Sequence, residues 1–184
     1  MAHPSFTEAL ASRPWLLADG ATGTNYFQMG LESGDAPELW NFDHPDRVRS
    51  LHRRFIEAGA DIVLTNTFGG NRHRLKLHNA QDRVREINIA AARNARAEAD
   101  AVDRPVYVGG SIGPTGEILE PVGTLSHDDA VAAFAEQALG DDLRRLRSQA
   151  QATVTALARV LHPLVADHAH LLGDDVHLLA DLHA

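Results

Sequence analysis

Three short apolar runs, separated by stretches with helical periodicity, constrain the fold of this chain most strongly. The runs cover residues 15–18, 62–64 and 106–108, and each is followed by glycine or small polar residues. Short, uninterrupted apolar runs are typical of strands buried on both faces of a sheet. Alternation of strands with helices implies parallel strands joined by right-handed crossovers. We therefore expect an α/β fold, either a (β/α)8 barrel or a doubly wound sheet.

Helix signals lie between these runs. Ser5 and Glu8 form a capping-box pattern for a short first helix. A second helix should begin at Pro45 and stop at Gly59. A third is expected over residues 82–99, and a fourth should begin near Ser126. The residues expected to face the core recur at helical spacing: Val48, Leu51, Phe55 and Ile56, then Val84, Ile87, Ala91 and Ala95, and finally Val131, Phe134 and Ala138.

Composition and charge exclude several classes of function. The 184 residues carry a formal net charge of -8 and are 44% hydrophobic, as in one globular domain. The acidic balance argues against nucleic-acid or anionic-membrane partners, which require a basic patch. No apolar run approaches the roughly 18 residues of a membrane span. Residues 1–13 lack the pattern of a secretory signal, so we expect a cytoplasmic protein. Cysteine is absent, which excludes disulfides, a thiolate nucleophile and a Cys-ligated metal.

The segments that follow the three strands hold the candidate binding residues. Ligands of parallel α/β folds bind at the carboxyl ends of the strands. These ends are residues 19–24, 65–70 and 109–116, which are rich in glycine and short polar side chains. We expect Asp19, Asn66 and Ser111 to converge on one mouth. Asp19 would either receive the ammonium of an amino acid or cap the next turn through backbone amides. Equally, the glycines of any one loop could serve only to shape a tight turn.

Several motifs in these loops and helices resemble the homocysteine-binding domain. They are Asp-Gly-Ala-Thr-Gly-Thr at 19–24, Glu-Leu-Trp-Asn at 38–41, Glu-Ala-Gly-Ala-Asp at 57–61, Thr-Asn-Thr-Phe-Gly at 65–69 with Asn71-Arg72, and Gly-Ser-Ile-Gly-Pro-Thr-Gly at 110–116. This domain occurs in homocysteine S-methyltransferases, in betaine–homocysteine methyltransferases and as the first domain of cobalamin-dependent methionine synthase. The resemblance covers residues 15–140, approximately the N-terminal half of such a domain.

The resemblance implies a (β/α)8 TIM barrel that transfers a methyl group to the sulfur of homocysteine and forms methionine. It also implies a zinc ion, held by three cysteine thiolates, that binds the substrate sulfur as a thiolate. A free thiol, with a pKa of about 8.5, is a weak nucleophile at neutral pH. The methyl donor is not determined by this sequence. The residues implied to bind homocysteine are Asp19 and Gly20 at its amino-acid end, Asn66, Thr67 and Phe68 along the pocket, and Ser111 and Gly113 at its near wall.

The chain departs from the family pattern after Gly140. Segment 141–184 has no aromatic residue, no Glu and no Lys, and it carries five histidines. The resemblance implies a fourth strand ending in a Glu-Thr motif, whose glutamate grips the substrate amine, and later cysteines; neither is found. We therefore expect a partial barrel of three βα units over residues 1–140 and a divergent helical tail over 141–184. No zinc is expected in this chain.

Three interpretations of the tail stay open. A frameshift near codon 140 would make it out-of-frame translation, leaving a truncated protein that is inactive alone and whose binding of homocysteine is weak or lost. Alternatively, a helix over 141–161 completes the half barrel by self-association, or forms a non-catalytic binding and assembly module. An unrelated α/β enzyme that acts on a small metabolite is a further alternative. Because a half barrel leaves a sheet edge open, we expect marginal stability or self-association.

Overall fold

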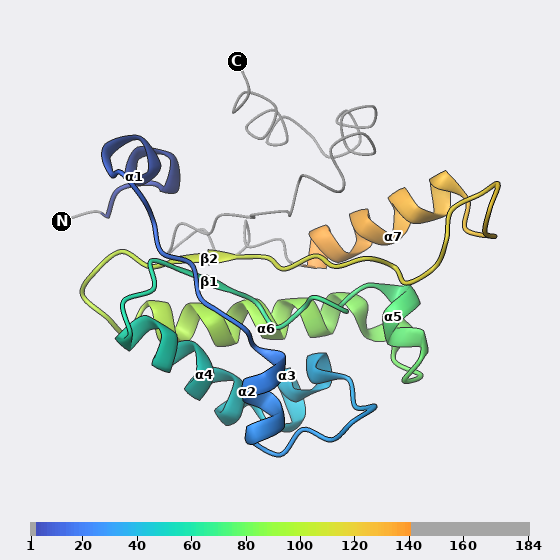
Figure 1. The fold of residues 1–184 in the computed structure, drawn as a ribbon, viewed down its shortest axis with the longest axis horizontal. Helices are drawn as coiled ribbons and strands as arrows, with labels where there is room; N and C mark the ends of the chain where they lie inside the picture. Colours follow the sequence, from blue (N-terminus) through green and yellow to red (C-terminus); the bar gives the residue numbers. More distant parts are fainter. Residues whose placement is uncertain (1–2, 141–184) are drawn as a thin grey trace.

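The computed structural model describes residues 3–140, so the expected tail over 141–184 lies outside the described residues. Helices, two of them short 3-10 turns (η), alternate with two strands (Figure 1). In chain order the elements are α1 (Phe6–Ser12), α2 (Gly23–Gln28), η1 (Pro37–Leu39), α3 (Trp40–Asp43), α4 (Pro45–Glu57), β1 (Ile62–Leu64), α5 (Arg72–Lys76), η2 (Gln81–Arg83), α6 (Val84–Ala99), β2 (Tyr107–Gly109) and α7 (His127–Gly140).

The sheet is parallel, as the alternation of strands and helices predicts. β1 pairs with β2 in a register that places Ile62 opposite Tyr107 and Leu64 opposite Gly109. On its other edge, β1 makes a parallel bridge to Ala18, and the N–H of Asp19 donates to the carbonyl of Ile62 at 2.9 Å. Segment 15–18 therefore takes the place of the first expected strand, with β1 at the centre of the described sheet.

Segment 15–18 is not buried on both faces, and that part of the prediction is wrong. Trp15 is 64% exposed and Leu17 47% exposed. The segment joins the sheet through one bridge at its edge, so its side chains lack the strand neighbours that cover Val63 in β1. Arg13 fixes the position of the chain just before this segment. Its guanidinium makes two hydrogen bonds to Asp61, whose carboxylate also accepts the N–H of Leu17.

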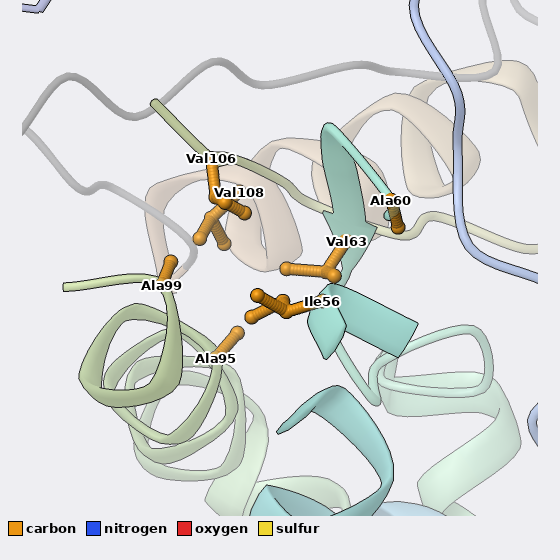
Figure 2. Packing of buried hydrophobic residues seen from close by; sticks show 7 residues of the cluster. All are labelled: Ile56, Ala60, Val63, Ala95, Ala99, Val106 and Val108. Atoms are coloured by element: carbon orange, nitrogen blue, oxygen red, sulfur yellow. The ribbon is translucent and has the colours of Figure 1, made fainter. Parts of the chain in front are cut away.

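α4 and α6 cover one face of the sheet and build the core (Figure 1). Their contact with the strands is a cluster of small and β-branched side chains, shown in Figure 2: Ile56, Ala60, Val63, Ala95, Ala99, Val106 and Val108. Alanine on α6 lets that helix approach the sheet closely, and the branched valines of the strands fill the remaining space. A second cluster around Tyr26 and Trp40 packs α2 and α3 against α4.

The helix predictions are confirmed in position but not in every detail. The capping box of Ser5 and Glu8 is formed, and Gly59 adopts a φ of +104° just after α4, which favours glycine. In α7, however, the predicted face of Val131, Phe134 and Ala138 is only half-buried. Among residues 127–138 of α7, the buried side chains are those of Ala130, Ala133 and Gln137. α7 lies close against α6, and small side chains permit that approach.

None of the helices within residues 3–140 combines the length and the apolar character needed to cross a bilayer.

Candidate functional site

Asp19 lies at the carboxyl end of segment 15–18, and its side chain makes a hydrogen bond to the neighbouring strand β1. Its Oδ2 accepts the backbone N–H of Leu64 at 2.9 Å, at the end of β1. This hydrogen bond joins Asp19 to β1 rather than to the next helix, whose N-cap residue Thr22 makes no capping hydrogen bond through its side chain. Burial raises the pKa of Asp19 to about 6, although the Leu64 N–H lowers it. This carboxylate is costly to ionise without a cation, and a cation placed beside it would be bound favourably.

Gly20 follows directly and is exposed. A side chain at this position would meet the ring of Phe55, whose Cε1 lies 3.3 Å from the place of a Cβ atom. Glycine therefore keeps the backbone open beside Asp19, which suits a ligand that approaches the main chain.

Asn66 at the end of β1 is buried and serves the scaffold. Its Nδ2 donates to the carbonyl of Pro37 at 2.6 Å, and its own carbonyl accepts Nδ2 of Asn41 at 2.9 Å. The two contacts tie the loop after β1 (residues 65–70, the second loop) to η1 through Pro37 and to α3 through Asn41. The side-chain amide of Asn66 therefore donates to a backbone carbonyl, and its role is to hold the loop that carries Thr67 and Phe68.

Thr67 and Ser111 meet in a buried network of hydroxyl and backbone groups. Oγ1 of Thr67 donates to the carbonyl of Ser111 at 2.8 Å, and it lies 2.6 Å from Oγ1 of Thr65. The N–H of Ser111 in turn donates to Oγ1 of Thr65 at 3.0 Å. The loops that follow β1 and β2 are thus joined directly beyond the carboxyl ends of both strands.

Phe68 and Gly113 form a second contact between these two loops. The N–H of Gly113 donates to the carbonyl of Phe68 at 2.9 Å. A Cβ atom on Gly113 would lie 2.3 Å from that carbonyl oxygen, so the contact requires glycine. The Phe68 ring is 58% exposed and offers an apolar wall at the rim.

Glu38 belongs to this region and was not among the predicted site residues. It is 6% exposed, and its Oε1 accepts the N–H of Gly69 at 2.7 Å. Burial raises its pKa despite that hydrogen bond. The hydroxyl of Tyr26 is buried with no hydrogen-bond partner in residues 3–140, and burial together with the charges of Asp19 and Glu38 raises its pKa. The signal for Glu38 was its own motif at 38–41, a carboxylate among apolar residues.

A cleft of about 370 Å³ is lined in part by Phe68 and Gly69 of the second loop. Of the predicted site residues, Phe68 lines it, whereas Asp19, Asn66, Ser111 and Gly113 do not. Its walls carry charges of both signs. They come from η1 and the two residues before it, from the second loop, from α5 and the turn after it, and from the loop after β2 (residues 110–116): Asp35, Ala36, Pro37, Glu38, Phe68, Gly69, Arg74, Leu75, His78 and Pro114.

The residues present do not fit the zinc site that the resemblance implies. The sequence has no cysteine, so it offers no thiolate ligand. Within residues 3–140 no three His, Asp or Glu side chains gather in a way that could hold a metal ion. We therefore assign no chemical step of this chain to a metal.

The fold defines a class: a parallel α/β protein whose candidate binding residues follow the carboxyl ends of its strands. Comparison with known proteins makes this specific, because the family model of homocysteine S-methyltransferase matches residues 16–161. The chain belongs to the homocysteine S-methyltransferase family. The matched range extends beyond Gly140, where the resemblance was expected to end.

Relatives agree with this assignment. The chain is 37% identical over 142 residues to methionine synthase of Mycobacterium leprae (strain TN); the matched region covers 72% of this chain and 12% of that protein. It is 37% identical over 134 residues to methionine synthase of Mycobacterium tuberculosis (strain ATCC 25618 / H37Rv), covering 68% of this chain and 11% of that protein. The chain thus spans about an eighth of these relatives.

Solved structures resemble it in fold. The homocysteine methyltransferase MmuM from Escherichia coli superposes in its oxidized form with a TM-score of 0.59 at 21% identity, covering 72% of this chain and 50% of that one. Its metallated form gives a TM-score of 0.62 at 19% identity, covering 87% of this chain and 62% of that one.

Proposed function

We propose that residues 15–140 form the homocysteine-binding side of a homocysteine S-methyltransferase barrel, consisting of its first three βα units. Family membership, the parallel order of segment 15–18, β1 and β2, and the position of the loops at the carboxyl ends of those strands support this proposal. Family membership also removes the alternative of an unrelated α/β enzyme. The boundary after Gly140 and a cytoplasmic location both stay predictions.

The observation that carries the proposal is the environment of Asp19. Its half-buried carboxylate has one oxygen held by Leu64, so its orientation is fixed before a ligand arrives. An amino acid brings an ammonium group, which forms a charge-assisted hydrogen bond with a carboxylate. The open backbone at Gly20 gives room for the amino-acid end, and the exposed ring of Phe68 offers an apolar surface for the rest of the substrate.

Binding can be tested by calorimetry on the full chain with L-homocysteine under reducing conditions. We expect Asp19→Asn to weaken binding by about tenfold or more, because a hydrogen bond to a charged group contributes about 1.5–3 kcal/mol. Asp128→Asn is the matched control, since it makes the same change on a side chain that is 95% exposed. Equal affinity of all three proteins would refute the role of Asp19, and no binding by the wild type would refute the site.

Methyl transfer is proposed to be absent from this chain alone, because no thiolate set activates the substrate sulfur. Purified chain would be incubated with zinc, L-homocysteine and, in turn, betaine, S-methylmethionine, S-adenosylmethionine or a methylated pterin. Methionine would then be measured by mass spectrometry. We expect no more methionine than in the buffer control. Formation above that control would overturn this part of the proposal while leaving the binding role intact.

A further inference from the structure

Gln137 is a fully buried amide on α7 that reaches both loops of the candidate site. Its exposed fraction is 0%. Nε2 donates to the carbonyl of Thr67 at 2.7 Å and lies 3.3 Å from the carbonyl of Ser111. These two carbonyls belong to the loops after β1 and after β2. One side chain from a helix late in the described chain therefore holds two loops that are 44 residues apart.

The position of this amide is not explained by packing alone. The other buried side chains over residues 127–138 of α7 are alanines, Ala130 and Ala133. Burying an amide is unfavourable unless its polar atoms find partners, so an apolar side chain would serve a purely packed position better. At Gln137 the two backbone carbonyls are the partners of Nε2, whereas Oε1 is buried with no hydrogen-bond partner among residues 3–140. The residue type thus matches the loops it contacts rather than the neighbouring helix face.

The surrounding structure reinforces the same contact. The Ser111 carbonyl also accepts Oγ1 of Thr67, and the Thr67 carbonyl also accepts the N–H of Gly70. A Cβ atom on Gly70 would lie 3.1 Å from Nε2 of Gln137 and 2.9 Å from Oδ1 of Asn88, so this turn admits only glycine without a shift. Asn88 on α6 donates to the Gly70 carbonyl at 2.9 Å. α6 and α7 therefore each contribute one buried side-chain amide that donates a hydrogen bond to the second loop.

We propose that Gln137 is a positioning residue that sets the geometry of the homocysteine site according to whether α7 is docked. The inference rests on the proposed function for its ligand, but the contact itself is independent of it. If the loops are in their binding arrangement only with α7 in place, ligand binding and docking of α7 must strengthen each other equally. Homocysteine should then protect α7, a helix whose residues are not part of the site.

Amide hydrogen exchange on the full chain tests both statements. Gln137→Met keeps the size of the side chain and removes the donors. Gln137→Glu also keeps the size, and its carboxyl regains a donor when protonated at acidic pH. The control is Glu136→Gln on the same helix, which removes an exposed ion pair with Arg72 at 2.7 Å but does not touch the loops. The reporters are the N–H groups of Ser111, Gly113 and Gly70, each bonded within the joined loops.

Without ligand, we expect protection of these amides to fall about tenfold in Gln137→Met, the change produced by losing roughly one buried hydrogen bond, and to stay near wild type in Glu136→Gln. Gln137→Glu should regain protection as the pH is lowered, relative to wild type at the same pH. With homocysteine, α7 should gain protection in wild type and less in Gln137→Met.

Unchanged loop protection in both Gln137 variants, or equal loss in Glu136→Gln, would overturn the positioning role. Should Gln137→Met fail to fold, the pH-dependent recovery of Gln137→Glu decides the question alone. Absence of any homocysteine effect in the wild type, with the ligand-free differences present, would refute the proposed function and leave the positioning role standing.

Discussion

Replacing Gly113 with alanine should destabilise the joined loops of the site. The added Cβ atom would lie 2.3 Å from the Phe68 carbonyl oxygen and 2.8 and 2.9 Å from two ring carbons of the same residue. The ring can rotate, but the carbonyl is backbone and accepts the N–H of Gly113 itself. Overpacking of this kind costs about 1–3 kcal/mol, and weakening that hydrogen bond adds about 1 kcal/mol. We therefore expect a loss of about 2–4 kcal/mol in the free energy of unfolding.

Urea denaturation followed by circular dichroism measures this loss. The matched control is Gly23→Ala in α2, where no atom lies within 4 Å of the added Cβ. Alanine is favoured over glycine in a helix by up to about 1 kcal/mol, so the control should be neutral or more stable. A Gly113→Ala protein within about 0.5 kcal/mol of wild type would refute the reasoning that these loops are rigidly joined.

Three further predictions concern buried ionisable groups. His52 is fully buried, and burial lowers its pKa to about 4 against the raising effect of Glu98. The unfolded histidine has a pKa of about 6.5, so the free energy of unfolding should fall by up to about 3 kcal/mol as the pH is lowered from there towards 4. In an Asp19→Asn background, His52→Leu should flatten this dependence of the free energy of unfolding on pH, measured by urea denaturation. That background is needed because the raised pKa of Asp19 makes its contribution to stability grow over the same fall in pH. Glu98→Gln should cost about 2 kcal/mol in urea denaturation, since this buried carboxylate accepts Nε of Arg49 at 2.7 Å and of Arg53 at 2.8 Å; an unchanged midpoint would show that these ion pairs contribute nothing. Finally, homocysteine affinity measured by calorimetry should rise as the pH passes upward through about 6, where Asp19 ionises, and a flat profile would contradict that role.

Local rules of sequence predicted much of the fold. The apolar run 62–64 and the start of α4 at Pro45 follow from burial and from the fixed φ of proline, which act within a few residues. The exposure of Trp15 could not be predicted in the same way, because it depends on which elements pair with that segment. The inner face of α7 was misplaced for a related reason. Hydrophobicity favoured Phe134, whereas the carbonyls of distant loops select Gln137.

The sequence predicted that loops at the strand ends lie together, but it did not predict which contacts each of their residues makes. The strand ends do bring Thr67 and Ser111 together, as parallel strands require. Asn66, expected beside the ligand, has its amide bound to the Pro37 carbonyl. Glu38 was missed because its partner, the N–H of Gly69, comes from a loop 31 residues away. Side-chain commitments of this kind are set by tertiary contacts, which single-sequence patterns do not encode.

The most direct test of the central claim is a titration of the ¹⁵N-labelled full chain with L-homocysteine, followed by amide chemical shifts. The account predicts saturable shifts at Gly20, Leu64 and Ser111, at the carboxyl ends of the strands. The amides of α1 should not move, because Phe6 of that helix packs on Tyr107 at the opposite end of β2. Shifts that do not saturate, or that fall on α1 instead of the strand ends, would contradict the claim that this chain carries the homocysteine-binding side of its family's fold.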